Sequence, residues 1–276
     1  MTVVKKILIV LSEWGYWGEE LVGPLDHFDE AGYESTFVTP RGKKPRPLAP
    51  SMDPKHIDLP RGYSVVSPET AKRVHEVDMS GRLDDPINLY EWFPDRPYVS
   101  SQHYFDELES YYTALSRVSE EATAYDALLL VGGSGPFVDM VNNFRIHDLI
   151  LAFYKAGKPI AAECYAVTCL ALAREIDLRK SILWGKHVTG HPLEDDWEDG
   201  TGFERTDFVI GPPPFVLEYI LRDATGPEGG FYGNFGRPVS VVVDYPFITA
   251  RTARDSYPAG ERIVEVLESG LTRYGW

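Results

Sequence analysis

The sequence predicts an α/β fold, a mostly parallel sheet sandwiched by helices, and three observations favour it. Two short apolar segments, residues 7–11 and 127–131, have the composition of parallel strands that are buried on both faces. The first begins a β–α–β unit, because a helical pattern and a second strand follow it. The second is separated from another apolar strand, residues 160–163, by an amphipathic helix. This alternation is typical of parallel sheets with right-handed crossovers.

The amino-terminal elements are expected in the order strand, helix, strand. Residues 7–11 form the first strand. Residues 20–30 form a helix that ends at Ala31-Gly32, since glycine commonly follows the last helical turn. Residues 34–39 (Glu-Ser-Thr-Phe-Val-Thr) are rich in strand-forming side chains and form the second strand.

Residues 40 to about 100 do not show this alternation of strand and helix patterns, and they are rich in Pro, Asp, Gly, Lys and Arg. We expect a single domain spanning residues 1–276, with an irregular lid or subdomain inserted at about 40–125 that includes a helix at 102–122. The insertion carries several aromatic residues: Tyr90, Trp92, Phe93, Tyr98, Tyr104 and Phe105. They either wall a pocket beneath the lid or form the core of the insertion itself.

The carboxyl-terminal half continues the pattern. After the strand at 127–131 comes the turn Gly132-Gly133-Ser134-Gly135. The following helix has an apolar face, made of Ile146, Leu149, Ile150 and Phe153. Gly157 ends that helix and Pro159 prevents its continuation. Further elements are expected as a helix at 215–221, strands at 239–243 and 247–249, and a last helix at about 257–269.

Composition disfavours several classes of partner. The formal net charge of −15 disfavours nucleic acid and anionic membrane surfaces as partners. No segment approaches the roughly 20 apolar residues of a membrane span, and the run at residues 5–10 is strand-sized, too short for a signal peptide. We therefore expect a cytoplasmic protein. Cys164 and Cys169 lie five residues apart on what reads as one helix, so they are poorly placed to form a disulfide.

The segment around Cys164 is the most informative feature for function. An apolar strand runs directly into Cys164, and small, helix-compatible residues follow it. This is typical of a strand–nucleophile–helix elbow, in which the helix terminus lowers the pKa of the thiol. The backbone N–H of Tyr165 can then stabilise an oxyanion, and the loop of Gly132, Gly133 and Ser134 can supply the second donor.

A base and an acid are also needed near the thiol. Of seven histidines, His191 stands at an expected strand end followed by a turn, a position from which catalytic side chains commonly project. A surface turn histidine is the alternative. Glu20 lies after the first strand, at the same sheet edge as Cys164, with Glu13 and Glu19 as competitors. No group of His, Cys, Asp or Glu has the spacing of a known metal motif.

These segments together resemble the ThiJ/PfpI superfamily. Glu20-Leu-Val-Gly-Pro24 resembles the early Glu-x-x-x-Pro motif of the family, and this register selects Glu20 over Glu19. Residues 161–164 (Ala-Ala-Glu-Cys) resemble its elbow, and residues 188–193 (Val-Thr-Gly-His-Pro-Leu) resemble a segment of its deglycase-like branch. Residues 247–249 with Ser256 resemble its carboxyl-terminal strand and helix. In the chaperone/glyoxalase III branch, His occupies the positions of Ser134 and Tyr165.

The resemblance implies a flavodoxin-like fold of the class I glutamine-amidotransferase type, and it implies roles. Cys164 would be the nucleophile, a protonated Glu20 would donate a hydrogen bond to its thiolate, and His191 would move protons. The implied function is cofactor-free, glyoxalase III-like conversion of a 2-oxoaldehyde to a 2-hydroxy acid by a homodimer. The alternatives are a hydratase or hydrolase of a bulkier carbonyl, amide or isonitrile, and a non-enzymatic chaperone or oxidation sensor.

Overall fold

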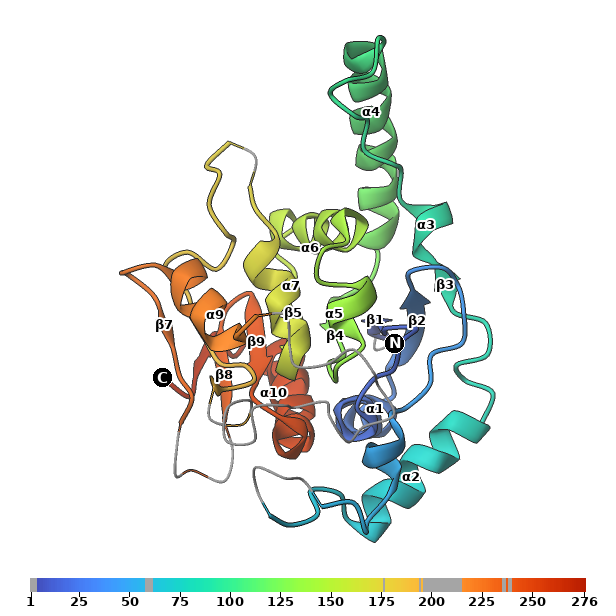
Figure 1. Ribbon diagram of the computed structural model, residues 1–276, viewed down its shortest axis with the longest axis vertical. Coiled ribbons are helices and arrows are strands. Elements are labelled where there is room, and N and C mark those ends of the chain that lie inside the picture. The colour runs from blue at the N-terminus through green and yellow to red at the C-terminus, as the bar shows by residue number, and fades with distance from the viewer. Residues whose placement is uncertain are drawn as a thin grey trace.

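A mostly parallel sheet forms the centre of the protein in the computed structural model, which describes residues 4–57, 62–175, 177–193, 195, 215–234, 237 and 240–276 (Figure 1). Within these ranges the sheet has eight strands in the order β10-β8-β9-β5-β4-β1-β2-β3. Their bounds are β1 Lys6–Val10, β2 Glu34–Thr39, β3 Ile87–Asn88, β4 Ala127–Leu130, β5 Ile160–Glu163, β8 Val241–Asp244, β9 Phe247–Ala250 and β10 Arg273–Tyr274. The predicted fold class is confirmed.

Pairing is parallel from β3 through to β9, whereas β8 pairs antiparallel with both of its neighbours, β9 and β10. The two strands expected at 239–243 and 247–249 are therefore β8 and β9 of a hairpin. A cis peptide joins Tyr245 to Pro246 between them. Because β9 pairs in parallel with β5, its carboxyl end lies at the same sheet edge as Cys164.

Alternate side chains along the strands pack into two hydrophobic cores, one on each face of the sheet. Leu8 and Leu128 belong to one core, whereas Ile9 and Leu129 belong to the other. Helices α1 (Gly18–Glu30) and α10 (Ser256–Ser269) pack together on the second face. The first face carries α6 (Phe144–Lys155), α7 (Val167–Leu172) and α9 (Leu217–Thr225), whose buried residues join the first core. The sheet is thus sandwiched, as expected.

The segment 40–125 is more regular than its composition suggested. It contains a 3-10 turn η1 (Ala49–Met52), α2 (Pro68–Met79), β3, α3 (Leu89–Trp92) and α4 (Tyr104–Ala122). Helix α2 begins at a Ser67 cap and packs on α1, and β3 extends the main sheet. The expectation of an irregular stretch was wrong here, because α2 is a mostly polar helix with a narrow apolar stripe, Ala71, Val74 and Val77.

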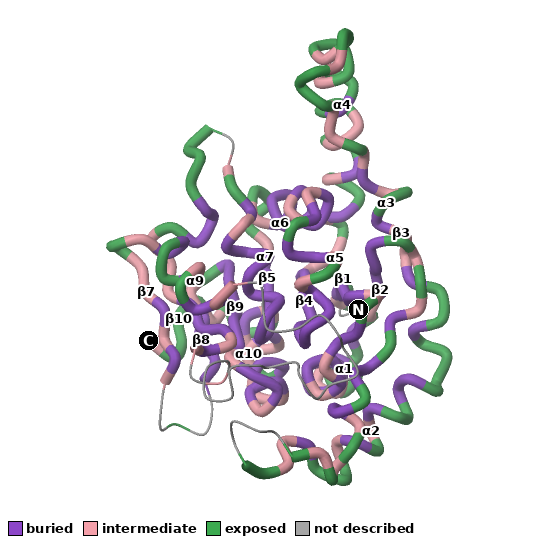
Figure 2. The backbone as a smooth tube through the Cα atoms, in the orientation of Figure 1, coloured by how far each residue is buried: buried purple, intermediate pink, exposed green. Residues whose placement is uncertain are grey.

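Helix α4 rises from the body of the protein as an arm (Figure 1). Its distal half is mostly exposed, whereas burial concentrates in the central strands (Figure 2). The aromatic residues of the insertion divide accordingly. Phe93 is buried in the core on the α6 face and Trp92 packs against that core, whereas Tyr98 and Phe105 are more than 80% exposed. Part of this aromatic set therefore forms core, in line with one of the two interpretations.

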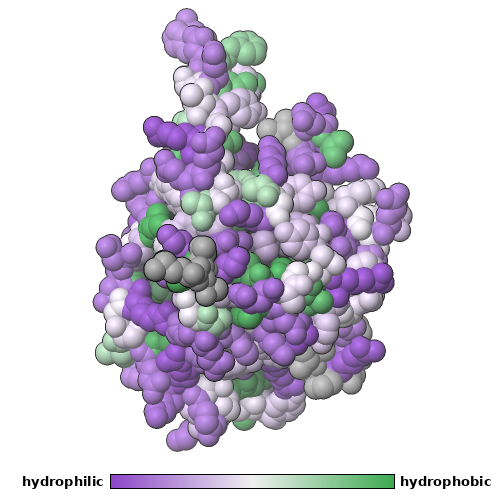
Figure 3. Space-filling model, turned by 180° about the vertical axis from the view of Figure 1, so that it is seen from behind, coloured by the Kyte–Doolittle hydropathy of each residue, from purple (hydrophilic) through white to green (hydrophobic). Residues whose placement is uncertain are grey.

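The surface agrees with the composition. The face seen in Figure 3 is mostly hydrophilic, with apolar residues scattered over it. None of the helices in the described part of the chain is both long and apolar enough to cross a membrane. A small parallel sheet, β6 (His187–Val188) with β7 (Gly230–Phe231), lies beside β8 and leads directly to His191.

Candidate active site

Cys164 sits at a strained bend between β5 and the 3-10 turn η2 (Cys164–Ala166). Its φ is +50°, in the left-handed region that non-glycine residues rarely adopt. Short side chains surround the bend, with Ala162 and Ala166 wholly buried on either side. The geometry is that of a nucleophile elbow, although the turn leads into the short α7 rather than a long helix.

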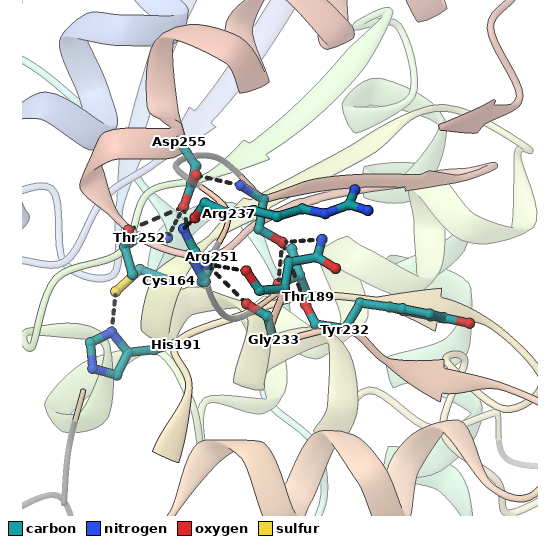
Figure 4. Close-up of polar contacts among 11 residues, drawn as sticks. Cys164, Thr189, His191, Tyr232, Gly233, Arg237, Arg251, Thr252 and Asp255 are labelled. Carbon is teal, nitrogen blue, oxygen red and sulfur yellow. Dashed lines mark hydrogen bonds and ion pairs between the residues drawn. The ribbon is translucent and has the colours of Figure 1, made fainter. Parts of the chain in front are cut away.

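The His191 ring contacts the sulfur of Cys164. Its Nδ1 lies 3.3 Å from Cys164 Sγ (Figure 4). The strand leading to His191 is fixed by hydrogen bonds: the Thr189 N–H donates to Thr249 Oγ1 at 2.9 Å, and Ser240 Oγ donates to Thr189 Oγ1 at 3.2 Å. Asp255 in turn accepts from the Ser240 N–H at 2.6 Å. The position of His191 is therefore set by β8, β9 and the start of α10.

Glu20, near the start of α1, is brought to the same sulfur. It is 1% exposed and hydrogen-bonds Cys164. Burial raises the pKa of Glu20 to about 8, against smaller lowering effects from Cys164 and the Gly132 N–H. At neutral pH most of this carboxyl is protonated, so it can donate its hydrogen to sulfur. Its competitor Glu19 has a pKa raised to about 7 by burial and faces Arg254, and Glu13 accepts backbone N–H groups of Arg41 and Lys43.

Two backbone N–H groups also point at Cys164, from Tyr165 and Gly133. Gly133 has φ +89°, and a Cβ at this position would lie 2.5 Å from the backbone nitrogen of Trp17. Gly132 is equally confined, since its Cβ would lie 2.4 Å from Glu20 Oε2. Ser134 is buried beside them at 4% exposure. The glycines thus let this loop approach the thiol closely enough to present an N–H to it.

The electrostatics of the thiol differ from the sequence expectation. Burial raises the pKa of Cys164 well above its usual range, and a charged Glu20 adds to this, while the N–H groups of Tyr165 and Gly133 lower it less. The expected lowering by a helix terminus was wrong, because desolvation outweighs two N–H donors. Below pH 8 the Glu20 contribution falls away as that carboxyl becomes neutral.

Two aromatic side chains outside the insertion, Phe137 and Phe215, were not assigned to the site from the sequence and lie near the ring of Tyr165 in the elbow. The Phe137 ring lies 4.6 Å from that of Tyr165 and 5.0 Å from that of Phe215, between centroids. The Tyr165 ring lies 4.2 Å from His191. Phe137 belongs to α5 (Pro136–Asp139), directly after the glycine loop. Its place two residues after Gly135 was the signal that could have identified it.

The described residues contain no group of three or more His, Cys, Asp or Glu side chains suited to hold a metal ion. Cys169 is a free cysteine, wholly buried in α7. Burial raises the pKa of its thiol, and the charge of Asp139 raises it further.

The fold and this cysteine elbow define a class of protein with a Cys–His–Glu site at the carboxyl edge of a parallel sheet, in which Cys164 and Glu20 are buried. A family model described as ThiJ/PfpI family-like matches residues 11–186, and the chain belongs to this family.

Individual relatives are distant. The bovine (Bos taurus) glutamine amidotransferase-like class 1 domain-containing protein 1 is 25% identical over 157 residues, which cover 57% of this chain and 66% of that protein, just under two thirds of its length. The Francisella tularensis Rapid Encystment Protein 24 kDa superimposes with a TM-score of 0.67 at 19% identity, covering 96% of this chain and 99% of that one. Glyoxalase III from Candida albicans gives 0.59 at 14% identity, covering 96% and 98%. These structures share the fold.

Proposed function

We propose that this protein is a cofactor-free cysteine enzyme that converts a 2-oxoaldehyde and water to a 2-hydroxy acid. The contact of 3.3 Å between Cys164 Sγ and His191 Nδ1, at a strained elbow with Glu20 bonded to the same sulfur, carries the proposal. Membership of the ThiJ/PfpI-like family and structural similarity to a glyoxalase III support it.

The proposed chemistry begins with transfer of the thiol proton to His191. The thiolate then adds to the aldehyde carbon, and the resulting oxyanion accepts hydrogen bonds from the backbone N–H groups of Gly133 and Tyr165, both of which point toward Cys164. Glu20 donates to the sulfur before attack, and so lowers the cost of a buried anion.

The remaining steps are proton transfers followed by hydrolysis. A base removes the former aldehyde hydrogen as a proton, and the neighbouring carbonyl carbon gains a proton, which leaves a thioester of the 2-hydroxy acid on Cys164. Water then cleaves the C–S bond and returns the thiol. One carbon is oxidised and its neighbour reduced, so the sequence balances without an external oxidant. We assign these proton transfers to His191.

A bulkier substrate is the second candidate, favoured by the aromatic wall. Phe137, Tyr165 and Phe215 place apolar rings beside the Cys164–His191 contact, which suits an aryl or branched substituent better than a methyl group. The same thiolate could add to a bulky carbonyl, amide or isonitrile carbon. A peroxide sensor has less support, because Cys164 is only 5% exposed and burial raises its thiol pKa.

Incubation of the wild-type protein with methylglyoxal, without glutathione, tests the proposal. We expect lactate to form, and we expect phenylglyoxal to be converted to mandelate with a higher kcat/KM. Conversion of neither compound above the rate in buffer would refute the 2-oxoaldehyde assignment and leave the hydratase or hydrolase.

A further inference from the structure

The ring of Tyr165 has no part in the proton transfers proposed above. Only the backbone N–H of this residue enters them, because it points at Cys164. The side chain is buried, and its ring centroid lies 4.2 Å from that of His191. Tyr165 thus touches both partners of the proposed proton transfer, the sulfur through its backbone and the imidazole through its ring.

The Tyr165 and His191 rings meet through their faces. Their planes are inclined by 36°, far from the perpendicular arrangement of an edge-to-face pair. Rings that met edge to edge would need a larger separation than 4.2 Å between centroids, since each ring extends beyond its own centroid. The face of the Tyr165 ring therefore covers the imidazole.

Neighbouring groups hold the Tyr165 ring in this place. Phe137 of α5 packs against it, with 4.6 Å between centroids, and Phe137 in turn contacts Phe215 at 5.0 Å. The backbone carbonyl of Tyr165 accepts a hydrogen bond from the Thr168 hydroxyl at 2.8 Å. The ring is thus fixed against the imidazole before any substrate binds.

The proposed proton transfer turns the imidazole into a cation. The S–H bond of Cys164 breaks, an N–H bond forms on His191, and a thiolate and an imidazolium result. The face of an aromatic ring carries negative electrostatic potential and attracts a cation within about 6 Å of its centroid. A neutral imidazole gains much less from this potential. The Tyr165 ring therefore stabilises the product of the transfer more than its starting state.

We propose that Tyr165 is a positioning residue whose ring stabilises the imidazolium form of His191, and that it thereby raises the fraction of Cys164 present as thiolate at neutral pH. The inference rests on the proposed thiolate chemistry. Because the oxyanion donor of Tyr165 is its backbone N–H, a substitution of the ring leaves that donor in place.

Charged and titratable groups belong to several of the elements around His191, and they determine how the ring must be tested. Among the described residues these groups are Cys164 of η2, Glu20 of α1, Asp195 in the segment after His191, Glu218 and Arg222 of α9, and Arg251 and Asp255 after β9. Changes of ring electronics at position 165 that preserve the ring shape leave all of these groups in place. Such changes therefore isolate the effect of the ring.

A series of phenylalanines of nearly constant shape provides this test without any substrate. Tyr165 is replaced by phenylalanine, by 4-fluorophenylalanine and by 3,4,5-trifluorophenylalanine, in which fluorine withdraws electron density from the ring face step by step. Peptide mass spectrometry measures the rate constant for alkylation of Cys164 by iodoacetamide at pH 7. We expect Tyr165→Phe to react within about twofold of wild type and the trifluoro variant to react roughly fivefold more slowly, the scale of a cation on an aromatic face.

Two controls separate the electrostatic effect of the ring from other effects. In a His191→Ala background the same series should be flat, because no imidazolium remains to be stabilised. Trifluorophenylalanine at Phe28, a wholly buried ring in the core on the α1 face, should leave the alkylation rate unchanged. Equal rates through the series in the protein that keeps His191 would overturn the inference. A decline that persists in His191→Ala would overturn it as well.

The rate of His191→Ala alone distinguishes a failure of this inference from a failure of the proposed function. If His191→Ala reacts like wild type, the proposed proton acceptor is refuted and the role of the Tyr165 ring falls with it. If His191→Ala is slow and the fluorinated series is flat, only the role of the Tyr165 ring is refuted.

Discussion

Nδ1 of His191 lies 3.3 Å from Sγ of Cys164, although the two residues follow strands of different sheets. Cys164 follows β5 of the main sheet and His191 follows β6 of the small one. Because burial raises the thiol pKa, this contact is what makes a thiolate accessible at neutral pH in our account.

Replacement of the imidazole should therefore slow every reaction of the thiol. For His191→Ala we expect the alkylation rate of Cys164 at pH 7 to fall by roughly 100-fold, within the range that a positioned base contributes. Peptide mass spectrometry measures it. His147→Ala is a suitable comparison, because His147 lies on α6 and its ring bonds to the Val141 carbonyl. A rate unchanged in His191→Ala would show that the thiol ionises without this partner.

The buried acid beside the thiol should make stability depend on pH. An unfolded glutamate loses its proton near pH 4.5, whereas the folded Glu20 keeps its proton up to about pH 8. Between these values the folded state binds more protons, so the free energy of unfolding falls as pH rises. A difference of one pKa unit between the folded and unfolded states corresponds to about 1.4 kcal/mol, so the loss amounts to a few kcal/mol.

Glu20→Gln cannot ionise and should remove this dependence. We expect the variant to gain stability relative to wild type as pH rises from 5 to 8, in urea unfolding followed by circular dichroism. A difference between wild type and variant that stays constant over this range would mean that the folded Glu20 titrates like an exposed glutamate.

Gly133 and Gly157 both have a positive φ, so alanine substitutions at these two positions give a matched test of the oxyanion loop. Gly133→Ala places a Cβ 2.5 Å from Trp17 N, whereas an alanine at Gly157 meets nothing within 4 Å. Both substitutions introduce left-handed strain of about 1 kcal/mol. We expect the free energy of unfolding of Gly157→Ala to fall by only this strain, with activity kept. For Gly133→Ala we expect the free energy of unfolding to fall by roughly 3 kcal/mol and most turnover to be lost. Thermal unfolding and the lactate assay measure both, and equal losses would contradict a close loop.

The aromatic wall should decide substrate size. Phe137→Ala removes the ring that contacts Tyr165 and Phe215. Because an aromatic contact contributes about 0.5–1.5 kcal/mol beyond area burial, we expect kcat/KM for phenylglyoxal to fall by roughly tenfold more than that for methylglyoxal. Phe105→Ala, on the exposed arm, is the control and should change neither. An equal fall in kcat/KM for both substrates would show that the Phe137 ring does not determine substrate size.

The fold was largely predictable because its central strands are continuous apolar runs. Residues 127–131 and 160–163 appear as β4 and β5, and the apolar face of Ile146, Leu149, Ile150 and Phe153 appears in α6. Helix α2 was missed because most of its residues are polar and only a narrow apolar stripe is buried. The antiparallel pairing of β8 was missed because strand direction is not encoded in composition.

The candidate site was only partly predictable for a related reason. Motif spacing singled out Cys164, Glu20 and His191, and the structure brings these three together. The raised pKa of the thiol could not be read from the sequence, because desolvation depends on what packs around the bend. Tyr165 was expected to act through its backbone N–H, and the contact of its ring with His191 could not be read from the sequence either. The homodimer stays a prediction.

Covalent attachment of substrate to Cys164 is the central claim, and acid-quenched turnover followed by peptide mass spectrometry tests it most directly. With phenylglyoxal, we predict a mass increase on the peptide of Cys164 during turnover that disappears when substrate is exhausted. Because the Cys164 and Cys169 side chains lie close in sequence, fragment ions must place the mass on Cys164. Undiminished turnover in Cys164→Ser, with no adduct in wild type, would contradict the account.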